Sequence, residues 1–99
     1  MNTNILNELY ALVKDRRENP VVASYTNYLQ DKGDAYIARK VGEESLELVL
    51  ALKDKDVNEI VSESADVLYH MTVALENLGI EWSDVSEELK IRRNKDKES

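Results

Sequence analysis

Four acidic residues form two matching pairs in the middle of the chain. Glu44 and Glu47 are three positions apart, and so are Glu63 and Asp66. In a helix, this spacing places both carboxylates of a pair on one face. Carboxylate oxygens are hard ligands, which suit Mg²⁺ or Mn²⁺ better than zinc. If the two pairs face each other, the sequence predicts a site for a divalent cation.

The alternative interpretation is that each pair lies on an ordinary solvated helix surface. The first pair, however, lies within KVGEESLELVLAL, residues 40–52, where apolar residues flank it on two sides. Burying carboxylates costs free energy unless a cation or hydrogen-bond donors meet them. Like charges three or four positions apart on a helix also repel each other. A bound divalent cation would offset both costs, so we favour a metal site.

Two further residues continue these acidic faces. Lys40 precedes Glu44 by one helical turn and is a candidate contact for a phosphate group. His70 follows Asp66 by one turn, and it could either contact a ligand or hydrogen-bond a helix carbonyl. The chain has one histidine and no cysteine, so a zinc site is not expected.

The composition predicts an all-α chain. Pro20 is the only proline, glycine occurs three times, and good helix formers are abundant. Apolar periodicity and capping signals predict helices over about 4–17, 25–32, 35–53, 56–78 and from 83 onwards. The predicted caps of the last four helices are Ser24, Asp34, Asp56 and Ser83. We expect Tyr69 to serve packing or an interface and Trp82 to anchor the last helix. The third and fourth helices are joined by a short turn, which makes them antiparallel neighbours. This arrangement brings the two acidic pairs together.

The third predicted helix is apolar on two sides. Ile37 and Val41 lie on one side, whereas Leu46 and Leu50 lie roughly opposite. A surface helix of a monomer has a polar outer face. We therefore expect this helix to pack against neighbours on both sides, in a four-helix-bundle-type core that homo-dimerisation completes.

Charge and length limit the remaining possibilities. The 99-residue chain carries a net charge of −7, which argues against a nucleic-acid partner. No apolar run approaches the ~20 residues of a membrane span, so no membrane partner is expected, and the lack of cysteine fits a cytoplasmic location. We expect one domain over residues 1–93 and a disordered tail over residues 94–99.

Two segments resemble a known enzyme family. KVGEESLELVLALKDKDVNEIVSESADVLYH, residues 40–70, resembles the phosphoribosyl-ATP pyrophosphatases of histidine biosynthesis. SYTNYLQDKG, residues 24–33, resembles the S-Y-T segment and K-G turn of that family. The wider MazG-like group of all-α nucleotide pyrophosphohydrolases carries E-x-x-E, a spacer and E-x-x-D. The resemblance covers about residues 4–93, and Ser45 stands where small apolar residues are commoner.

The resemblance implies Mg²⁺-dependent hydrolysis of phosphoribosyl-ATP to phosphoribosyl-AMP and pyrophosphate, with Mn²⁺ as a possible substitute. Metal would be held by Glu44, Glu47, Glu63 and Asp66. The attacking water would be oriented or deprotonated by Glu43 or Glu47. The candidate substrate contacts are Ser24, Tyr25, Thr26, Lys32, Lys40, His70, Arg92 and Arg93. Residues 24–26 could instead form only a helix cap, and most of the basic residues could be ordinary solvated side chains.

Two other functions are compatible with the same residues. A house-cleaning pyrophosphatase acting on free nucleoside or deoxynucleoside triphosphates would keep the metal site but need a different pocket for base and sugar. A non-catalytic helical dimerisation module would leave the acids solvated, and Mg²⁺ would not stabilise it. A substrate panel separates the first from a phosphoribosyl-ATP enzyme, and calorimetric titration with Mg²⁺ and nucleotide tests the second.

Overall fold

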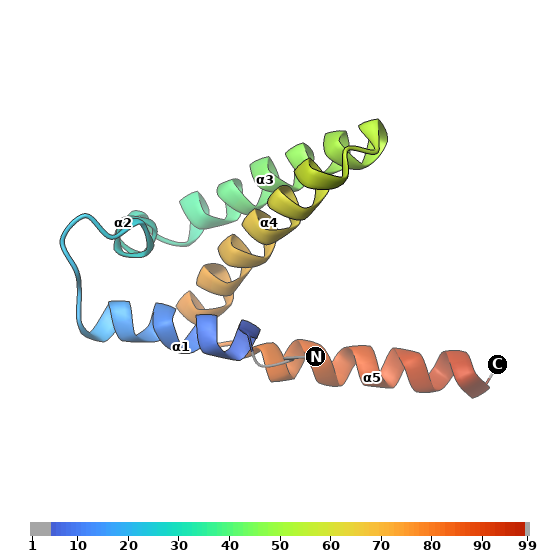
Figure 1. Cartoon of the computed structure of the whole chain (residues 1–99). Helices are drawn as coiled ribbons and strands as arrows, with labels where there is room; N and C mark the ends of the chain where they lie inside the picture. Colours follow the sequence, from blue (N-terminus) through green and yellow to red (C-terminus); the bar gives the residue numbers. More distant parts are fainter. Residues whose placement is uncertain (1–4, 99) are drawn as a thin grey trace.

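The computed structural model describes residues 5–98, which form five helices and no strand (Figure 1). The helices are α1 (Ile5–Glu18), α2 (Tyr25–Lys32), α3 (Asp34–Asp54), α4 (Val57–Asn77) and α5 (Trp82–Glu98). The predicted all-α class is confirmed. No helix in this described part is long and apolar enough to cross a membrane.

Capping contacts confirm several predicted helix boundaries. The Ser24 hydroxyl accepts a hydrogen bond from the Asn27 N–H at 3.2 Å and so caps α2. Gly33 ends α2 with a φ of 91°, a left-handed conformation that glycine adopts without strain. Asp56 caps α4, because its carboxylate accepts from the Glu59 N–H at 3.2 Å.

The predicted cap of α3 is wrong. Asp34 is the first helical residue, and Gly33 occupies the N-cap position without a side-chain hydrogen bond. The Asp34 carboxylate instead accepts a hydrogen bond from the Asn77 side chain, at the end of α4. This long-range contact ties the beginning of α3 to the end of its partner helix.

Helix α5 also differs from the prediction at both ends. Asp84 rather than Ser83 makes the capping contact, since its carboxylate accepts from the Glu81 N–H at 2.9 Å. The predicted disordered tail, residues 94–99, is helical as far as Glu98, and residue 99 lies outside the described residues. Basic side chains in the last turn favour this extension, because they oppose the negative end of the helix dipole.

Helices α3 and α4 form a long antiparallel hairpin, with α1 packed against α4 (Figure 1). Four helices each contribute one fully buried side chain to the core: Val13, Leu29, Ile37 and Val73. Trp82 is buried where α5 begins, and its indole N–H donates to the Thr72 hydroxyl at 3.0 Å. The expected anchoring role of Trp82 agrees with this contact.

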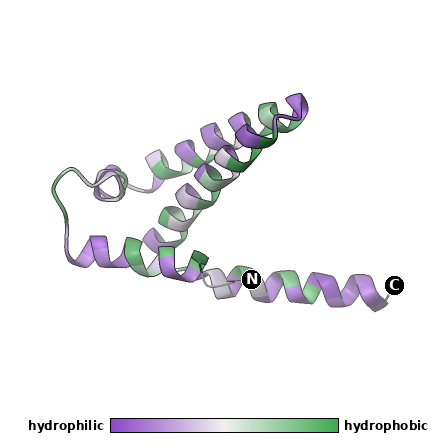
Figure 2. Cartoon of the chain, viewed as in Figure 1, coloured by the Kyte–Doolittle hydropathy of each residue, from purple (hydrophilic) through white to green (hydrophobic). Residues whose placement is uncertain are grey.

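A large part of the hairpin's apolar surface is not covered within one chain. Figure 2 shows hydrophobic residues along both of its helices, whereas most of α5 is hydrophilic. At least half of each of these side chains is exposed: Leu46, Val49, Leu50, Leu52, Val57 and Val61. The expected packing on two sides is therefore not achieved by the chain's own helices.

Candidate active site

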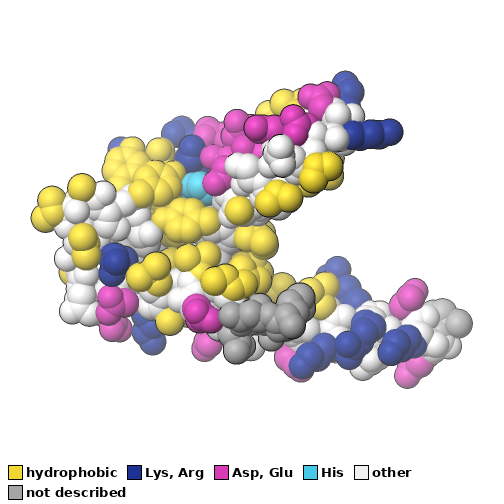
Figure 3. All heavy atoms as spheres, viewed as in Figure 1, with side chains coloured by type: hydrophobic (Ala, Val, Ile, Leu, Met, Phe, Trp, Pro, Cys, Tyr) yellow, Lys and Arg dark blue, Asp and Glu magenta, His cyan; other side chains and the backbone are white. Residues whose placement is uncertain are grey.

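Three carboxylates converge on the face between α3 and α4. Glu44, Glu63 and Asp66 each offer one oxygen, and these oxygens all lie within 4.8 Å of one another. The spacing of Glu63 and Asp66 puts them on one face of α4, and the hairpin brings that face against Glu44. Figure 3 shows acidic side chains gathered along this part of the hairpin. We call these three residues the carboxylate cluster.

Glu47 lies beside the carboxylate cluster. It lines an open cleft of about 230 Å³ together with Glu63 and residues near the hairpin turn. Its carboxyl group helps to raise the pKa of Glu44. The structure thus brings together three of the four predicted metal ligands, with the fourth next to them.

The environment of the cluster raises the pKa of two of its carboxyl groups. Burial raises the pKa of Glu44, and the hydrogen bond to Glu47 and repulsion from Glu47 and Asp66 raise it further. Burial also raises the pKa of Glu63, with smaller effects from Glu47, Asp66 and Glu59. Both shifts reflect the cost of placing several negative charges in one partly desolvated volume.

One buried carboxylate oxygen lacks a hydrogen-bond partner among residues 5–98, which is consistent with a cation site. Oε2 of Glu63 is buried and makes no hydrogen bond within the described part of the chain. Buried polar atoms nearly always have a partner, because desolvating them without one is costly. All the converging donors are oxygens, which is the ligand set that Mg²⁺ and Mn²⁺ prefer.

Lys40 lies one turn before Glu44 on α3, and Glu43 directly precedes Glu44. The Lys40 ammonium is 3.3 Å from Glu43 and 3.8 Å from Glu44. Arg39 also pairs with Glu43, at 3.6 Å. The hydrogen bond to Glu43 is the main cause of the raised pKa of Lys40. Lys40 thus lies where the sequence predicted it, whereas Glu43 is paired with two cations and is not part of the cluster.

His70 is buried, and both of its ring nitrogens are hydrogen-bonded. Nδ1 lies 2.8 Å from the backbone carbonyl oxygen of Asp66, so Nδ1 carries the proton and donates it. Nε2 lies 3.0 Å from the Tyr25 hydroxyl and, in the neutral ring, accepts a hydrogen bond from it. Of the two alternatives for His70, the bond to a helix carbonyl is the one observed. His70 would therefore act on a ligand only indirectly, through its hydrogen bond with the Tyr25 hydroxyl.

The other residues of the S-Y-T segment have local partners. The Ser24 hydroxyl is used as the cap of α2. The Thr26 hydroxyl is hydrogen-bonded to the Tyr69 hydroxyl at 2.5 Å. Tyr69 itself packs against the core, as predicted. Of these three residues, only Tyr25 reaches toward the carboxylate cluster, through His70.

The structure does not bring Arg92 and Arg93 to the cluster of the same chain. Both lie on α5, which extends away from the hairpin (Figure 1). Arg92 pairs with Glu88 on its own helix, at 2.9 Å. Lys32 lies at the end of α2, over the rings of Tyr28 and Tyr36.

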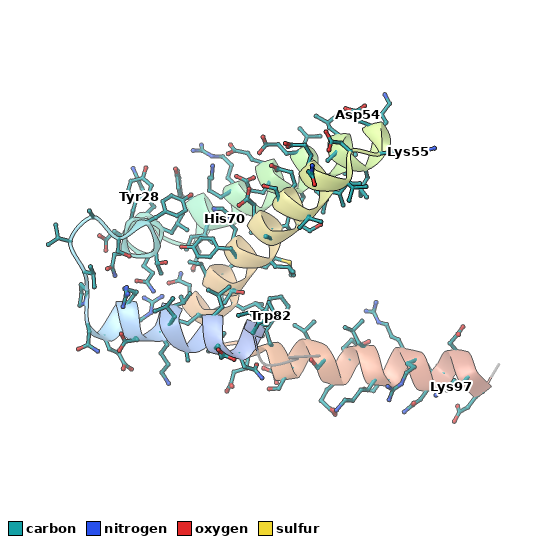
Figure 4. The ribbon with its side chains drawn as sticks, in the orientation of Figure 1. Tyr28, Asp54, Lys55, His70, Trp82 and Lys97 are labelled. Atoms are coloured by element: carbon teal, nitrogen blue, oxygen red, sulfur yellow. The ribbon has the colours of Figure 1, made fainter. Side chains whose placement is uncertain are left out.

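The sequence prediction missed an aromatic group next to the site. Tyr25 stacks on Tyr28 with ring centroids 6.0 Å apart and on Tyr69 at 6.1 Å. The Tyr36 ring lies nearly perpendicular to Tyr28 at 5.9 Å. Figure 4 shows Tyr28 and His70 on the same side of the molecule, from α2 and α4. The three-residue spacing of Tyr25 and Tyr28 was the available signal, but Tyr36 and Tyr69 join them only through the fold.

A family model described as phosphoribosyl-ATP pyrophosphohydrolase matches residues 6–93. The chain belongs to this family. The match extends from α1 into α5 and includes every residue of the carboxylate cluster. The resemblance found in the sequence is confirmed, and the family is part of the MazG-like superfamily.

Individual relatives agree with this assignment. The phosphoribosyl-ATP pyrophosphatase of Streptococcus thermophilus is 47% identical over 91 residues, which are 92% of this chain and 88% of the relative. The enzyme of the same name from Clostridium acetobutylicum is 43% identical over 92% of this chain and 83% of its own length. The histidine biosynthesis bifunctional protein HisIE of Parasynechococcus marenigrum is 49% identical over 87% of this chain, but the chain spans only 39% of that protein.

Proposed function

We propose that this chain hydrolyses phosphoribosyl-ATP to phosphoribosyl-AMP and pyrophosphate, a step of histidine biosynthesis, and that it uses Mg²⁺. The observation that carries the proposal is the carboxylate cluster with its buried, unpartnered Glu63 oxygen, in a chain of this family. The names of relatives that the chain covers almost completely support the substrate. The lack of cysteine fits a cytoplasmic location, which we include in the proposal.

In this reaction water attacks the α-phosphorus, the bond to the bridging oxygen breaks, and pyrophosphate leaves. Glu44, Glu63 and Asp66 would hold Mg²⁺, which would supply positive charge to stabilise the leaving group and to make water more acidic. Mn²⁺ prefers similar oxygen ligands and should substitute. A metal is needed because the chain's own residues place net negative charge where a triphosphate must bind.

Glu47 is our choice for the residue that orients or deprotonates the water. It borders the cleft beside Glu63, and its negative charge contributes to the raised pKa of Glu44. Glu43 was the other candidate, but it is ion-paired with Lys40 and Arg39 and lies outside the carboxylate cluster. We assign Lys40 as a contact for a phosphate oxygen, and the 3.8 Å distance from its ammonium group to Glu44 supports this assignment.

We further propose that the working enzyme is a homodimer. The exposed apolar side chains of the hairpin motivate this proposal, since a monomer rarely leaves such a surface in water. Dimerisation would also allow Arg92 and Arg93 of one copy to approach the cluster of the other. Both arginines are therefore retained as candidate substrate contacts.

The direct test is to add phosphoribosyl-ATP and Mg²⁺ to the pure protein and measure pyrophosphate release. We expect turnover that EDTA abolishes and Mn²⁺ restores. A Glu63→Gln variant is the matched control, because it keeps the shape of the side chain but removes a ligand charge. If the protein releases no pyrophosphate while an active relative does so in parallel, the proposed function is wrong. Faster turnover of free deoxynucleoside triphosphates would favour a house-cleaning role instead.

A further inference from the structure

A second group of polar side chains lies outside the carboxylate cluster, where α2 meets α3. It contains two phenols and two cations, and we call it the tyrosine–cation cluster: Tyr28, Tyr36, Lys32 and Arg39. The two phenol oxygens are 3.4 Å apart, and the rings are nearly perpendicular. Tyr28 is 45% exposed, so these hydroxyls are accessible to a ligand.

Both cations of this cluster remain available to an anion. The Lys32 ammonium is 5.5 Å from the ring centroids of Tyr28 and Tyr36, and it makes no ion pair with any described residue. The Arg39 guanidinium is 5.1 Å from the centroid of Tyr36. Its ion pair with Glu43 is long, at 3.6 Å, and exposed on both sides, so it is weak. Two positive charges and a pair of phenol hydroxyls therefore converge in a chain whose net charge is −7.

The tyrosine–cation cluster and the carboxylate cluster lie along one side of α3. Tyr36, Lys40 and Glu44 follow each other at four-residue steps, so they share a helix face. The eight residues from Tyr36 to Glu44 correspond to about 12 Å along the helix axis. On this face, Figure 3 shows a hydrophobic group next to the histidine and the acidic side chains. One elongated ligand can therefore reach both clusters.

We propose that the tyrosine–cation cluster binds a second phosphate of the substrate, the phosphate monoester carried by its additional ribosyl group. This inference rests on the proposed function, which places the triphosphate at the carboxylate cluster. Phosphate oxygens accept strong hydrogen bonds from guanidinium and ammonium groups. The exposed rings of Tyr25 and Tyr28 provide an apolar surface for the base between the two phosphate-bearing ends.

This site explains how the enzyme distinguishes its substrate from ordinary nucleotides. A free nucleoside triphosphate carries phosphate at one end only, so it leaves the tyrosine–cation cluster empty. Binding energy from this remote site then lowers the KM for the doubly phosphorylated substrate alone. Losing the site should leave the use of simple triphosphates unchanged.

The kinetic test compares Lys32→Met and Arg39→Gln with the wild type, using phosphoribosyl-ATP and ATP as alternative substrates. Each variant should raise the KM for phosphoribosyl-ATP about tenfold, the loss of one charge-assisted contact, with a kcat close to that of the wild type. Kinetics with ATP should not change. Lys53→Met is the matched control, because Lys53 is an exposed lysine at the far end of α3. An unchanged KM for phosphoribosyl-ATP in both variants would overturn the inference.

A binding test separates this inference from the proposed function. Calorimetry in EDTA should show that wild-type protein binds ribose 5-phosphate and does not bind ribose. Binding should weaken about tenfold in Lys32→Met and Arg39→Gln, and should persist in Glu63→Gln. If the wild type binds ribose 5-phosphate in this way but releases no pyrophosphate, only the proposed function fails. If it is active but its binding of ribose 5-phosphate is absent or unaffected by both variants, the second phosphate site is wrong.

Discussion

The Tyr25 hydroxyl donates a 3.0 Å hydrogen bond to Nε2 of His70. Nδ1 of the same ring donates to the backbone carbonyl of Asp66, whose side chain belongs to the carboxylate cluster. Tyr25 also stacks on Tyr28. One short chain of contacts thus links the tyrosines of α2 to the carboxylate cluster, and His70 is its central member.

We predict that Tyr25→Phe lowers kcat/KM about tenfold, which corresponds to about 1.4 kcal/mol, because it removes the hydroxyl group that lies between His70 and the substrate. The free energy of unfolding should fall by only about 1 kcal/mol, the value of one hydrogen bond. Steady-state kinetics and urea unfolding measure the two quantities. Tyr10→Phe, a change on α1 away from the site, should alter neither.

The tautomer of His70 gives an independent check. Since a carbonyl oxygen can only accept, the imidazole carries its proton on Nδ1. Nitrogen-15 NMR should show Nε2 as the unprotonated nitrogen, in the wild type and in Tyr25→Phe alike. A ring protonated on Nε2 in the wild type would contradict the geometry described here.

We predict that Asp66→Asn lowers turnover by more than about 100-fold, about 2.7 kcal/mol, because it removes one charge of the metal site. The same substitution should leave the melting temperature of the metal-free protein equal or raise it, since repulsion of Glu44 is relieved. Calorimetric melting in EDTA and pyrophosphate release measure the two effects. A clearly lower metal-free melting temperature would mean that Asp66 is structural.

The raised pKa values of Glu44 and Glu63 predict how stability depends on pH. When these groups have pKa values above the usual 4.5 in the folded state, the folded protein binds more protons than the unfolded chain. The metal-free protein should therefore lose stability as the pH rises from about 4.5 through the raised values. Denaturation in EDTA over this range should show a smaller decrease for Glu63→Gln than for the wild type. If the stability of the wild type and of Glu63→Gln falls equally with pH, the folded state does not bind extra protons at Glu63.

The sequence predicted the hairpin and the carboxylate cluster because both depend on local rules. Helix periodicity and the Asp56 cap define α3 and α4, and a short turn forces them to be antiparallel. Once α3 and α4 are paired, the geometry of the hairpin is enough to bring Glu44 close to Glu63 and Asp66. The acidic pairs could therefore be placed without any knowledge of the rest of the fold.

Contacts between residues far apart in sequence could not be predicted in this way. The helical pattern gives no indication that the Asn77 side chain donates a hydrogen bond to the Asp34 carboxylate. Asp34 therefore does not cap α3, and Gly33 is the N-cap residue. The meeting of Tyr28 with Tyr36 likewise depends on the turn at Gly33, which sets the angle between α2 and α3. Such angles follow from packing, which periodicity does not determine.

We predict that a charge placed on the exposed hairpin surface weakens self-association. Val49→Lys and Val61→Lys alter side chains that are 57% and 65% exposed in one chain and that a second copy would bury. Light scattering over a range of concentrations should show dimers for the wild type and monomers for the variants. Val22→Lys, in the loop before α2 and 96% exposed, is the control and should not change the association. A wild type that stays monomeric at high concentration would disprove the dimer.

The ion pair between Arg17 and Glu76 joins α1 to the end of α4 and allows a last prediction. Arg17 Nε lies 3.1 Å from both Glu76 carboxylate oxygens, and Nη2 lies 2.8 Å from one of them. The Glu76 side chain is only 7% exposed, so Arg17→Met leaves a buried carboxylate without its partner. We expect this change to reduce the free energy of unfolding by about 3 kcal/mol, measured by urea denaturation.

A double-mutant cycle separates the ion pair from simple packing. Arg17→Met combined with Glu76→Leu removes both charges, and the double variant should recover most of the loss, because apolar side chains of similar size replace the pair. Arg16→Met is the matched control, since among residues 5–98 the Arg16 side chain forms an ion pair only with its exposed neighbour Asp15, at 3.3 Å. It should change stability by less than about 0.5 kcal/mol. If the two single losses simply add in the double variant, Arg17 stabilises the α1–α4 contact through its aliphatic stem and not through its charge.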